Sequence, residues 1–306
     1  MARTVKEMPE VERYAVASRN LEKAKAFAAR YGFEKAYGSY EEMLNDPEVE
    51  LVYVASPHSH HYEHAKMCLE HGKHVLLEKA FTVNYAQAKE IIDLAESKGL
   101  LLAEALWTRY MPSRNMIDEL VMSGIIGDVI TLEANLGYEM SKKERLVEPS
   151  LAGGALLDVG VYPINFALMV INEEIKSFQT AVTMSEKGVD LYNSITLKFE
   201  SGKMAMLHSN MLARTNRLGV IYGTQGFIEV ENINNCEEIR VYDRDQRLIR
   251  VDAIPTQITG YEYEVTSCIN AIQNHKTECD EMPHSETLRI MKLLDDIREE
   301  WAKNKQ

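Results

Sequence analysis

Along the first 105 residues, short apolar runs alternate with stretches in which apolar residues recur every three or four positions. The apolar runs predict strands buried on both faces, and the periodic stretches predict amphipathic helices. We expect strands over 11–17, 51–55, 74–77 and 100–105, and helices over 21–31, 40–45, 60–71 and 85–97, with residues 1–6 as the end of an earlier helix. Such β-α alternation with short connections is typical of a parallel, doubly wound sheet. The pattern therefore predicts an α/β protein whose first domain spans residues 1–105.

After residue 106 the pattern changes to alternating apolar and polar positions. We expect strands over 129–135, 177–184, 192–199, 203–210, 217–222, 226–231 and 239–242, and helices over 116–123, 162–171, 261–275 and 286–301. These strands predict a large, mostly antiparallel open sheet in a second domain, residues 106–306, with helices on one face. The free face, with Met204, Met206 and Met211 nearby, is a candidate surface for a second copy, so we expect a homodimer or homotetramer.

The composition excludes some classes of function. With 34 basic and 47 acidic residues, the formal net charge of −13 argues against a nucleic-acid or anionic-membrane surface. We identify no apolar run of the ~20 residues that a membrane span needs, and no apolar leader at the start. Four cysteines without CxxC spacing favour free thiols over disulfides. We therefore expect a cytoplasmic protein with no membrane partner.

Polar residues follow the predicted parallel strands at the edge where such sheets bind ligands. They are Ser18-Arg19, Ser56-Pro57-His58, Glu78-Lys79 and the stretch after Glu104. In dinucleotide folds an acidic residue near the first of these positions holds a ribose 2′-OH, whereas an arginine suits a 2′-phosphate. Arg19, with no acid beside it, therefore favours NADP over NAD. The alternative is that Arg19 is a solvated residue at a helix start.

One expected feature is missing from the N-terminal end. A dinucleotide-binding sheet begins with a strand and a glycine-rich turn whose amides hold the pyrophosphate, and no GxGxxG is present. Because that strand belongs in the middle of the sheet, two apolar strands would lack a ladder partner. Our hypothesis is that Met1 is an internal methionine of the first helix. Roughly 20 residues would then lie upstream, judged from the ~30-residue size of a βαβ unit.

Six histidines fall between positions 58 and 74. His60 and His64 have the i, i+4 spacing of a zinc site on a helix, but no cysteine or carboxylate completes the ligand set. A zinc enzyme is therefore the least favoured alternative, and we predict no metal. We expect His58 and His61 to border the ligand cleft, with the other histidines on the helix surface.

Several stretches resemble a known family. Residues 56–61 and 72–80 are similar to the TPNxxH and GKHVxxEKP motifs of the Gfo/Idh/MocA oxidoreductases, and residues 106–112 and 153–163 resemble the branch with dihydrodiol dehydrogenase and glucose–fructose oxidoreductase. The resemblance implies a Rossmann-type first domain and NAD(P)-linked hydride transfer on sugars, polyols or vicinal diols. It also implies dimers or tetramers formed through the sheet of the second domain.

The resemblance assigns roles by matched position. It makes Lys79 the lysine near the nicotinamide and the reacting oxygen, Asp158 the acid of the second motif and Tyr162 the proton donor. The predicted cofactor-binding residues are Ser18, Arg19, Ser56, Pro57, His58, His61, Glu78, Lys79, Trp107 and Arg109. Ala80 replaces the usual proline, so we expect a trans Lys79–Ala80 bond, and His58 replaces the usual asparagine.

The same chemistry follows from the residue types. Reduction of a carbonyl builds negative charge on oxygen and needs a proton donor and a nearby cation, which Tyr162 and Lys79 can provide. Asp158, four positions before Tyr162, can pair with the lysine or hold a substrate hydroxyl. In the structural alternative, Lys79 pairs with Glu78 or Glu104 and Tyr162 is half-buried core. For the whole chain, the alternative is a catalytically silent nucleotide- or sugar-binding protein that acts as a sensor.

Overall fold

Short parallel strands and the helices between them form the first region of the computed structural model, which describes residues 1–303. The strands are β1 (Ala15–Ala17), β2 (Lys35–Tyr37), β3 (Leu51–Val54), β4 (His74–Glu78) and β5 (Leu102–Ala105). The helices are α1 (Ala2–Lys6), α2 (Leu21–Tyr31), α3 (Tyr40–Leu44), α4 (His61–Glu70) and α5 (Tyr85–Lys98). Local sequence sets the helix ends. Asn20 accepts a hydrogen bond from the Lys23 amide at 3.0 Å to start α2, and Gly32, with φ of 74°, ends it.

The parallel strands form two separate pieces of sheet. β1 pairs with β2, and β3, β4 and β5 form the second piece, with no pairing between β1 and β3 within residues 1–303. The strand expected over 11–17 is shorter, since residues 11–14 pair with no strand in the described part of the chain. β2 was not expected, because its three residues, Lys-Ala-Tyr, form no apolar run.

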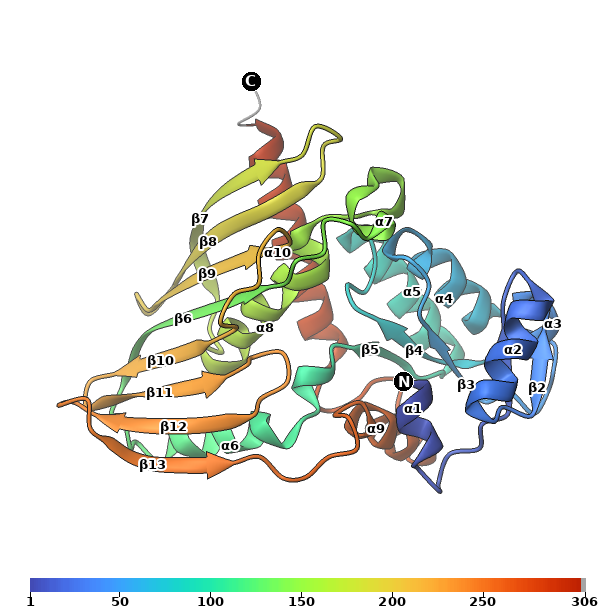
Figure 1. Ribbon diagram of the computed structural model, residues 1–306, viewed down its shortest axis with the longest axis horizontal. Helices are drawn as coiled ribbons and strands as arrows, with labels where there is room; N and C mark the ends of the chain where they lie inside the picture. The colour runs from blue at the N-terminus through green and yellow to red at the C-terminus, as the bar shows by residue number, and fades with distance from the viewer. Residues whose placement is uncertain (304–306) are drawn as a thin grey trace.

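An eight-stranded sheet dominates the second region, in the order β13-β12-β11-β10-β6-β9-β8-β7 (Figure 1). Its strands are β6 (Val129–Gly137), β7 (Ile175–Met184), β8 (Asp190–Phe199), β9 (Met204–Asn210), β10 (Gly219–Gly223), β11 (Gly226–Glu231), β12 (Glu238–Asp243) and β13 (Leu248–Ala253). Only β6 and β9 pair in parallel; the other pairs are antiparallel. The edge strand β13 was not expected, because most of its residues are exposed and it lacks a buried alternation.

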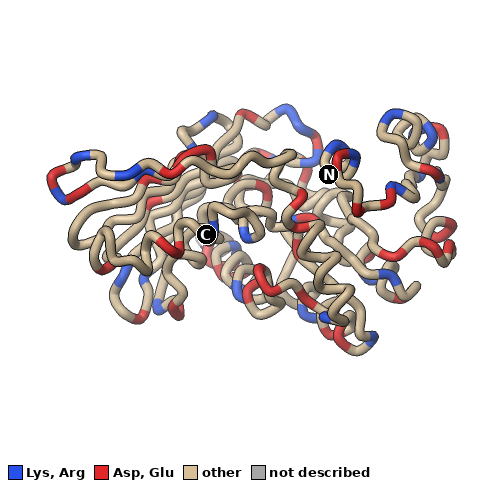
Figure 2. The backbone as a smooth tube through the Cα atoms, turned by 90° about the horizontal axis from the view of Figure 1, so that it is seen from below, with Lys and Arg blue, Asp and Glu red and all other residues tan. Residues whose placement is uncertain are grey.

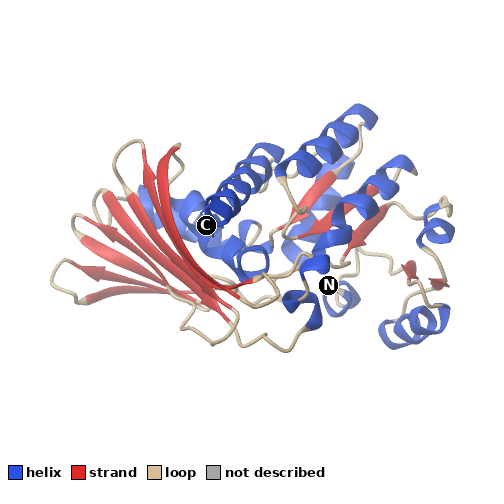
Figure 3. Ribbon diagram, turned by 90° about the horizontal axis from the view of Figure 1, so that it is seen from above, coloured by secondary structure: helices blue, strands red, loops and turns tan. Residues whose placement is uncertain are grey.

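Helices cover one face of this sheet and leave the other open (Figure 3). They are α6 (Pro112–Met122), α8 (Val161–Val170) and α10 (His284–Lys303), while α9 (Glu262–Gln273) lies beside α1 (Figure 1). Contrary to our sequence interpretation, the helical stretch Pro149–Val170 is long and apolar enough to cross a membrane. Since 89% of its apolar window is buried inside the fold, we interpret it as core.

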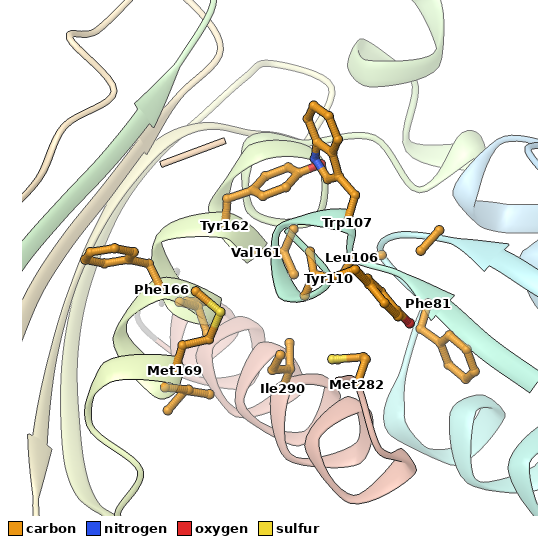
Figure 4. Packing of buried hydrophobic residues seen from close by; sticks show 14 of the residues in the cluster. Phe81, Leu106, Trp107, Tyr110, Val161, Tyr162, Phe166, Met169, Met282 and Ile290 are labelled. Atoms are coloured by element: carbon orange, nitrogen blue, oxygen red, sulfur yellow. The ribbon is translucent and has the colours of Figure 1, made fainter. Parts of the chain in front are cut away.

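The two regions share one hydrophobic core. Buried side chains continue from Phe81 after β4, through Leu106 and Tyr110, to Met282 and Ile290 beside and within α10 (Figure 4). This packing sets the carboxyl ends of β4 and β5 against the start of α8. Outside the core, acidic and basic residues are interspersed along the chain (Figure 2), so the net charge of −13 is not gathered on one element.

Candidate active site

Lys79 leaves the carboxyl end of β4 and reaches the start of α8. Its Nζ donates to the backbone oxygen of Asp158 at 2.6 Å and lies 3.2 Å from Asp158 Oδ1. Neither predicted structural partner takes this ammonium group. The Glu78 carboxylate accepts the backbone N–H of Lys79 at 3.2 Å, and Glu104 accepts from Thr287 at 2.8 Å. Lys79 and Asp158 therefore meet as expected for a shared site.

Asp158 lies in a π-helical turn, Leu156–Gly160, that leads directly into α8. The buried Asp190 holds the start of this turn, because its Oδ2 accepts the Leu156 amide at 2.7 Å. Gly154, with φ of 124°, passes so close to Asp190 that a β-carbon there would lie 2.1 Å from Oδ1. Only glycine fits this backbone conformation and this approach.

The Asp158 carboxylate is ionised despite its burial. Burial alone would raise its pKa, but the charges of Lys79 and Arg145 outweigh burial and lower the pKa below its usual range. Arg145, from the short helix α7 (Glu144–Val147), places an Nη1 atom 3.0 Å from the same Oδ1 atom that Lys79 contacts. One carboxylate oxygen therefore receives two cations.

Tyr162 stands beside this ion pair, in the first turn of α8. Lys79 Nζ lies 5.2 Å from the centre of its ring, and Figure 4 shows its phenol end against the indole of Trp107. Burial raises the pKa of Tyr162 well above its usual value. The phenol therefore keeps its proton at neutral pH and is available as a proton donor.

The two predicted cleft histidines differ in role. Burial and the Lys79 charge lower the pKa of His58 to about 3, so the ring is neutral. Its Nδ1 donates to the Ala152 oxygen at 3.1 Å, which leaves Nε2 as an acceptor. His61 places one ring nitrogen 2.9 Å from the Ala80 oxygen and the other 2.8 Å from the Ser56 oxygen. His61 thus ties together the loops after β3 and β4.

The peptide bond between Lys79 and Ala80 is cis, and our expectation of a trans bond was wrong. The expectation considered only the local preference of a non-proline residue. Here Ala80 is fully buried and its carbonyl contacts the His61 ring, so tertiary packing outweighs that preference.

Ser18 and Arg19 follow β1, and Ser56, Pro57 and His58 follow β3, as the strand pattern predicted. Arg19 is exposed, whereas His58 is buried next to Lys79 and Asp158. The structure therefore brings His58 to the catalytic candidates and leaves Ser18 and Arg19 at the end of the separate β1–β2 piece.

Trp107 and Arg109 follow β5 but point to different neighbours. Trp107 stacks on Tyr261 with ring centres 4.3 Å apart and adjoins Tyr162 (Figure 4). The Arg109 guanidinium is buried and donates to Asn165 of α8 at 2.5 Å and to Glu286 of α10 at 2.8 Å. The buried charge of Arg109 has a protein partner on α10, and its contact with a cofactor stays a prediction.

The histidine cluster forms no evident metal site. Among the residues that the structure describes, no three His, Cys, Asp or Glu side chains are grouped as metal ligands would be. His64 contacts the Ser56 hydroxyl at 3.0 Å, and the His60 and His64 rings lie 5.5 Å apart.

Sequence reasoning also missed two residues of the site, Arg145 and Asp190, because neither belongs to a recognisable motif.

Two family models and several curated proteins match the chain. The model described as an oxidoreductase family with an NAD-binding Rossmann fold matches residues 1–106, and the GFO/IDH/MocA C-terminal domain model matches residues 115–229. Trans-1,2-dihydrobenzene-1,2-diol dehydrogenase of Xenopus tropicalis is 41% identical over 217 residues, covering 71% of this chain and 66% of the frog protein. The Sus scrofa protein of the same name is 33% identical over 294 residues, covering 94% and 87%.

Solved structures show the same fold. A 3-ketoreductase from Actinomadura kijaniata, in complex with NADP and TDP-benzene, matches with a TM-score of 0.89 at 24% identity, covering 97% of this chain and 92% of its own. Levoglucosan dehydrogenase, in complex with NADH and levoglucosan, matches with a TM-score of 0.84 at 21% identity, covering 95% and 88%. The predicted α/β class is confirmed. Taken with the family models and the Sus scrofa protein, the predicted family is confirmed as well: this chain belongs to the GFO/IDH/MocA oxidoreductase family, with its NAD-binding Rossmann domain in residues 1–106.

Proposed function

We propose that this chain is an NADP-dependent dehydrogenase or reductase acting on a CH–OH group of a sugar, polyol or vicinal diol, with Lys79, Asp158 and Tyr162 as its catalytic residues. The supporting observation is their convergence. Lys79 Nζ lies 3.2 Å from Asp158 Oδ1 and 5.2 Å from the centre of the Tyr162 ring. The names of the relatives, dihydrodiol and levoglucosan dehydrogenases, support the substrate class.

The three residues suit a carbonyl–carbinol interconversion. A bound nicotinamide supplies or accepts the hydride. As a carbonyl is reduced, negative charge grows on its oxygen, and the Lys79 ammonium group stabilises that charge while the Tyr162 phenol donates a proton to it. Asp158 holds the ammonium group in place through its backbone oxygen and through one oxygen of its ionised carboxylate.

The residues at the strand ends fit a dinucleotide. Ser56 and His58 follow β3, Glu78 ends β4 and Lys79 follows it, and ligands bind at this edge of parallel sheets. The exposed Arg19 guanidinium after β1 suits a 2′-phosphate, which favours NADP over NAD. The 3-ketoreductase bound NADP and levoglucosan dehydrogenase bound NADH, so solved relatives supply examples of both.

We further propose a homodimer or homotetramer that forms through the open face of the large sheet. Tyr222, Phe227 and Tyr242 lie in a row on neighbouring strands, and the Phe227 and Tyr242 rings stack with centres 4.6 Å apart.

A cytoplasmic location is also proposed, supported by four cysteines that are all free thiols.

The experiment that tests the enzyme function compares Lys79→Met and Tyr162→Phe with the wild type. Both variants should bind NADPH with unchanged affinity in a fluorescence titration. Both should lose about 10²–10⁴-fold in kcat on a panel of sugars and diols, the range expected when a proton donor or a group that stabilises transition-state charge is lost. Lys98→Met, at the exposed end of α5, serves as the control.

Two outcomes would count against the proposal. Unchanged turnover in both variants would remove Lys79 and Tyr162 from the mechanism. Tight NADPH binding by a wild type that turns over no member of the panel would favour the silent sensor instead.

A further inference from the structure

Arg145 forms the solvent side of the catalytic cluster. Its Nη1 lies 3.0 Å from Asp158 Oδ1, and its side chain is 44% exposed, whereas that of Asp158 is 6% exposed. Lys79 contacts the same oxygen from the interior, with a side chain that is 13% exposed. Of the two cations bound to this oxygen, the Arg145 guanidinium is therefore the more exposed.

The segment that carries Arg145 is held over the site by contacts at both ends. The Ala152 oxygen accepts from His58 at 3.1 Å, which joins the segment to the first region. The Leu146 oxygen accepts the Gly154 amide at 2.9 Å, and Lys187 pairs with Glu148 at 2.9 Å. These contacts fix the backbone after Arg145, and the Met140 amide, which donates to the Met211 oxygen at 2.8 Å, fixes the backbone before it.

Most of the donors on Arg145 remain available. A guanidinium has five N–H donors in a planar fork that matches a carboxylate or a phosphate. Within residues 1–303, the contact with Asp158 is the one polar contact of the Arg145 side chain. The other carboxylate near Lys79, that of Glu78, already accepts hydrogen bonds from the Tyr53 hydroxyl and from the Lys79 amide. An anionic oxygen group of a ligand would complete the coordination of Arg145.

We propose that Arg145 is a specificity-determining residue that selects substrates carrying an anionic oxygen group, a carboxylate or a phosphate, near the reacting carbon. This inference rests on the proposed function and narrows its substrate class to acidic sugars and sugar phosphates. Arg145 binds the anionic group, while Lys79 and Tyr162 act on the reacting oxygen. Because Arg145 also touches Asp158, the anionic group binds close to the catalytic lysine.

The test uses three ligands with the same ring stereochemistry: D-glucose, D-glucuronate and D-glucose 6-phosphate. We expect kcat/KM to be about tenfold or more higher for one of the anions than for glucose. Arg145→Gln should lower kcat/KM for that anion by about 10- to 100-fold, as for a lost hydrogen bond to a charged group. It should lower kcat/KM for glucose by a smaller factor, because glucose loses only the contribution that Arg145 makes through Asp158. Lys143→Gln removes an exposed charge on the same segment and should leave all three values unchanged.

Calorimetric titration of the same ligands into NADP-saturated protein separates this inference from the proposed function. Anion binding that Arg145→Gln abolishes would support the inference even without turnover, in which case only the proposed function fails. Equal kcat/KM and equal affinity for glucose and both anions would overturn it. An equal loss for neutral and anionic ligands in Arg145→Gln would also overturn it, because Arg145 would then act only through Asp158.

Discussion

Lys79 shows how a buried ammonium group is held at the carboxyl end of a parallel strand. Removing an ion from water costs several kcal/mol, and a partner with good geometry is needed to offset that cost. The backbone oxygen of Asp158 lies 2.6 Å from Lys79 Nζ, and its carboxylate Oδ1 lies 3.2 Å from the same atom. The face of the Tyr162 ring lies beside this ammonium group. The ion pair therefore fixes the position of the cation, and the phenol next to it remains protonated.

Arg19 is expected to decide between the two dinucleotides. Arg19→Ala should weaken NADPH binding by about 10- to 100-fold, because a guanidinium–phosphate hydrogen bond contributes about 1.5–3 kcal/mol. Binding of NADH, which lacks the 2′-phosphate, should change by less than about threefold. Fluorescence titrations measure both affinities, and Arg30→Ala, at the far end of α2, is the matched control. An equal loss of affinity for both dinucleotides would mean that Arg19 does not bind the 2′-phosphate.

At this scale, motifs predict some site residues and miss others. Lys79 and Asp158 could be predicted because each lies in a recognisable stretch next to a predicted strand or helix. Arg145 could not, since a single arginine among charged residues carries no pattern and only the fold brings it to Asp158. The pairing of Arg109 with Glu286 could not be predicted either, because Glu286 lies on the last helix and no local pattern connects the two residues.

Among the elements, the π-helical turn Leu156–Gly160 is the one on which the site depends. Buried polar groups support it from the sheet below. Ser209 of β9 donates to Asn193 of β8 at 3.0 Å, Asn193 donates to Asp190 at 3.1 Å, and Asp190 accepts the Leu156 amide. This chain of hydrogen bonds positions the backbone that carries Asp158.

Asp190→Asn is expected to change how the free energy of unfolding depends on pH. Burial raises the pKa of the Asp190 carboxyl to about 6, against ~3.9 in an unfolded chain. A raised pKa stabilises the folded state while the group is protonated, and this contribution is lost as pH rises through the folded value. Between pH 4 and pH 7 the wild type should therefore lose about 2–3 kcal/mol of unfolding free energy relative to Asp190→Asn.

Urea denaturation at several pH values measures this difference. Asp93→Asn, on the exposed side of α5, should follow the wild type at each pH. Parallel curves for the wild type and Asp190→Asn would mean that the buried carboxyl does not titrate in this range.

Element prediction succeeded where the local sequence controls the ends. The bounds of α2 agree with expectation because Asn20 and Gly32 cap it, and β3 and β4 agree because both are continuous apolar runs. β2 and β13 were missed, since pairing with a neighbouring strand, and not their own pattern, makes them strands. The parallel strands likewise divide into two pieces of sheet because of how they pair, which the pattern of each strand alone does not show.

Over the whole molecule, the large sheet has one face covered by helices and one open face (Figure 3). Tyr222, Phe227 and Tyr242 form an aromatic row across β10, β11 and β12, with ring centres 5.9 and 4.6 Å apart. Met204 of β9 and Tyr192 of β8 are exposed large hydrophobic residues of the same sheet. Monomeric proteins rarely leave large apolar patches in water, and closed symmetric pairing covers such a face with a second copy of itself.

Under the proposed pairing through the open face, Phe227→Lys is expected to convert the oligomer to a smaller species. In a two-fold pairing, residues near the symmetry axis face their own copies, so a charge on this row would meet a like charge in a desolvated interface. Size-exclusion chromatography with light scattering should show a smaller mass for Phe227→Lys than for the wild type at the same concentration. Met122→Lys introduces the same charge at a methionine that is 85% exposed on α6, on the helical side, and should keep the wild-type mass. A wild type that is monomeric at high concentration, or a Phe227→Lys protein with unchanged mass and fold, would mean that the open face is not the interface.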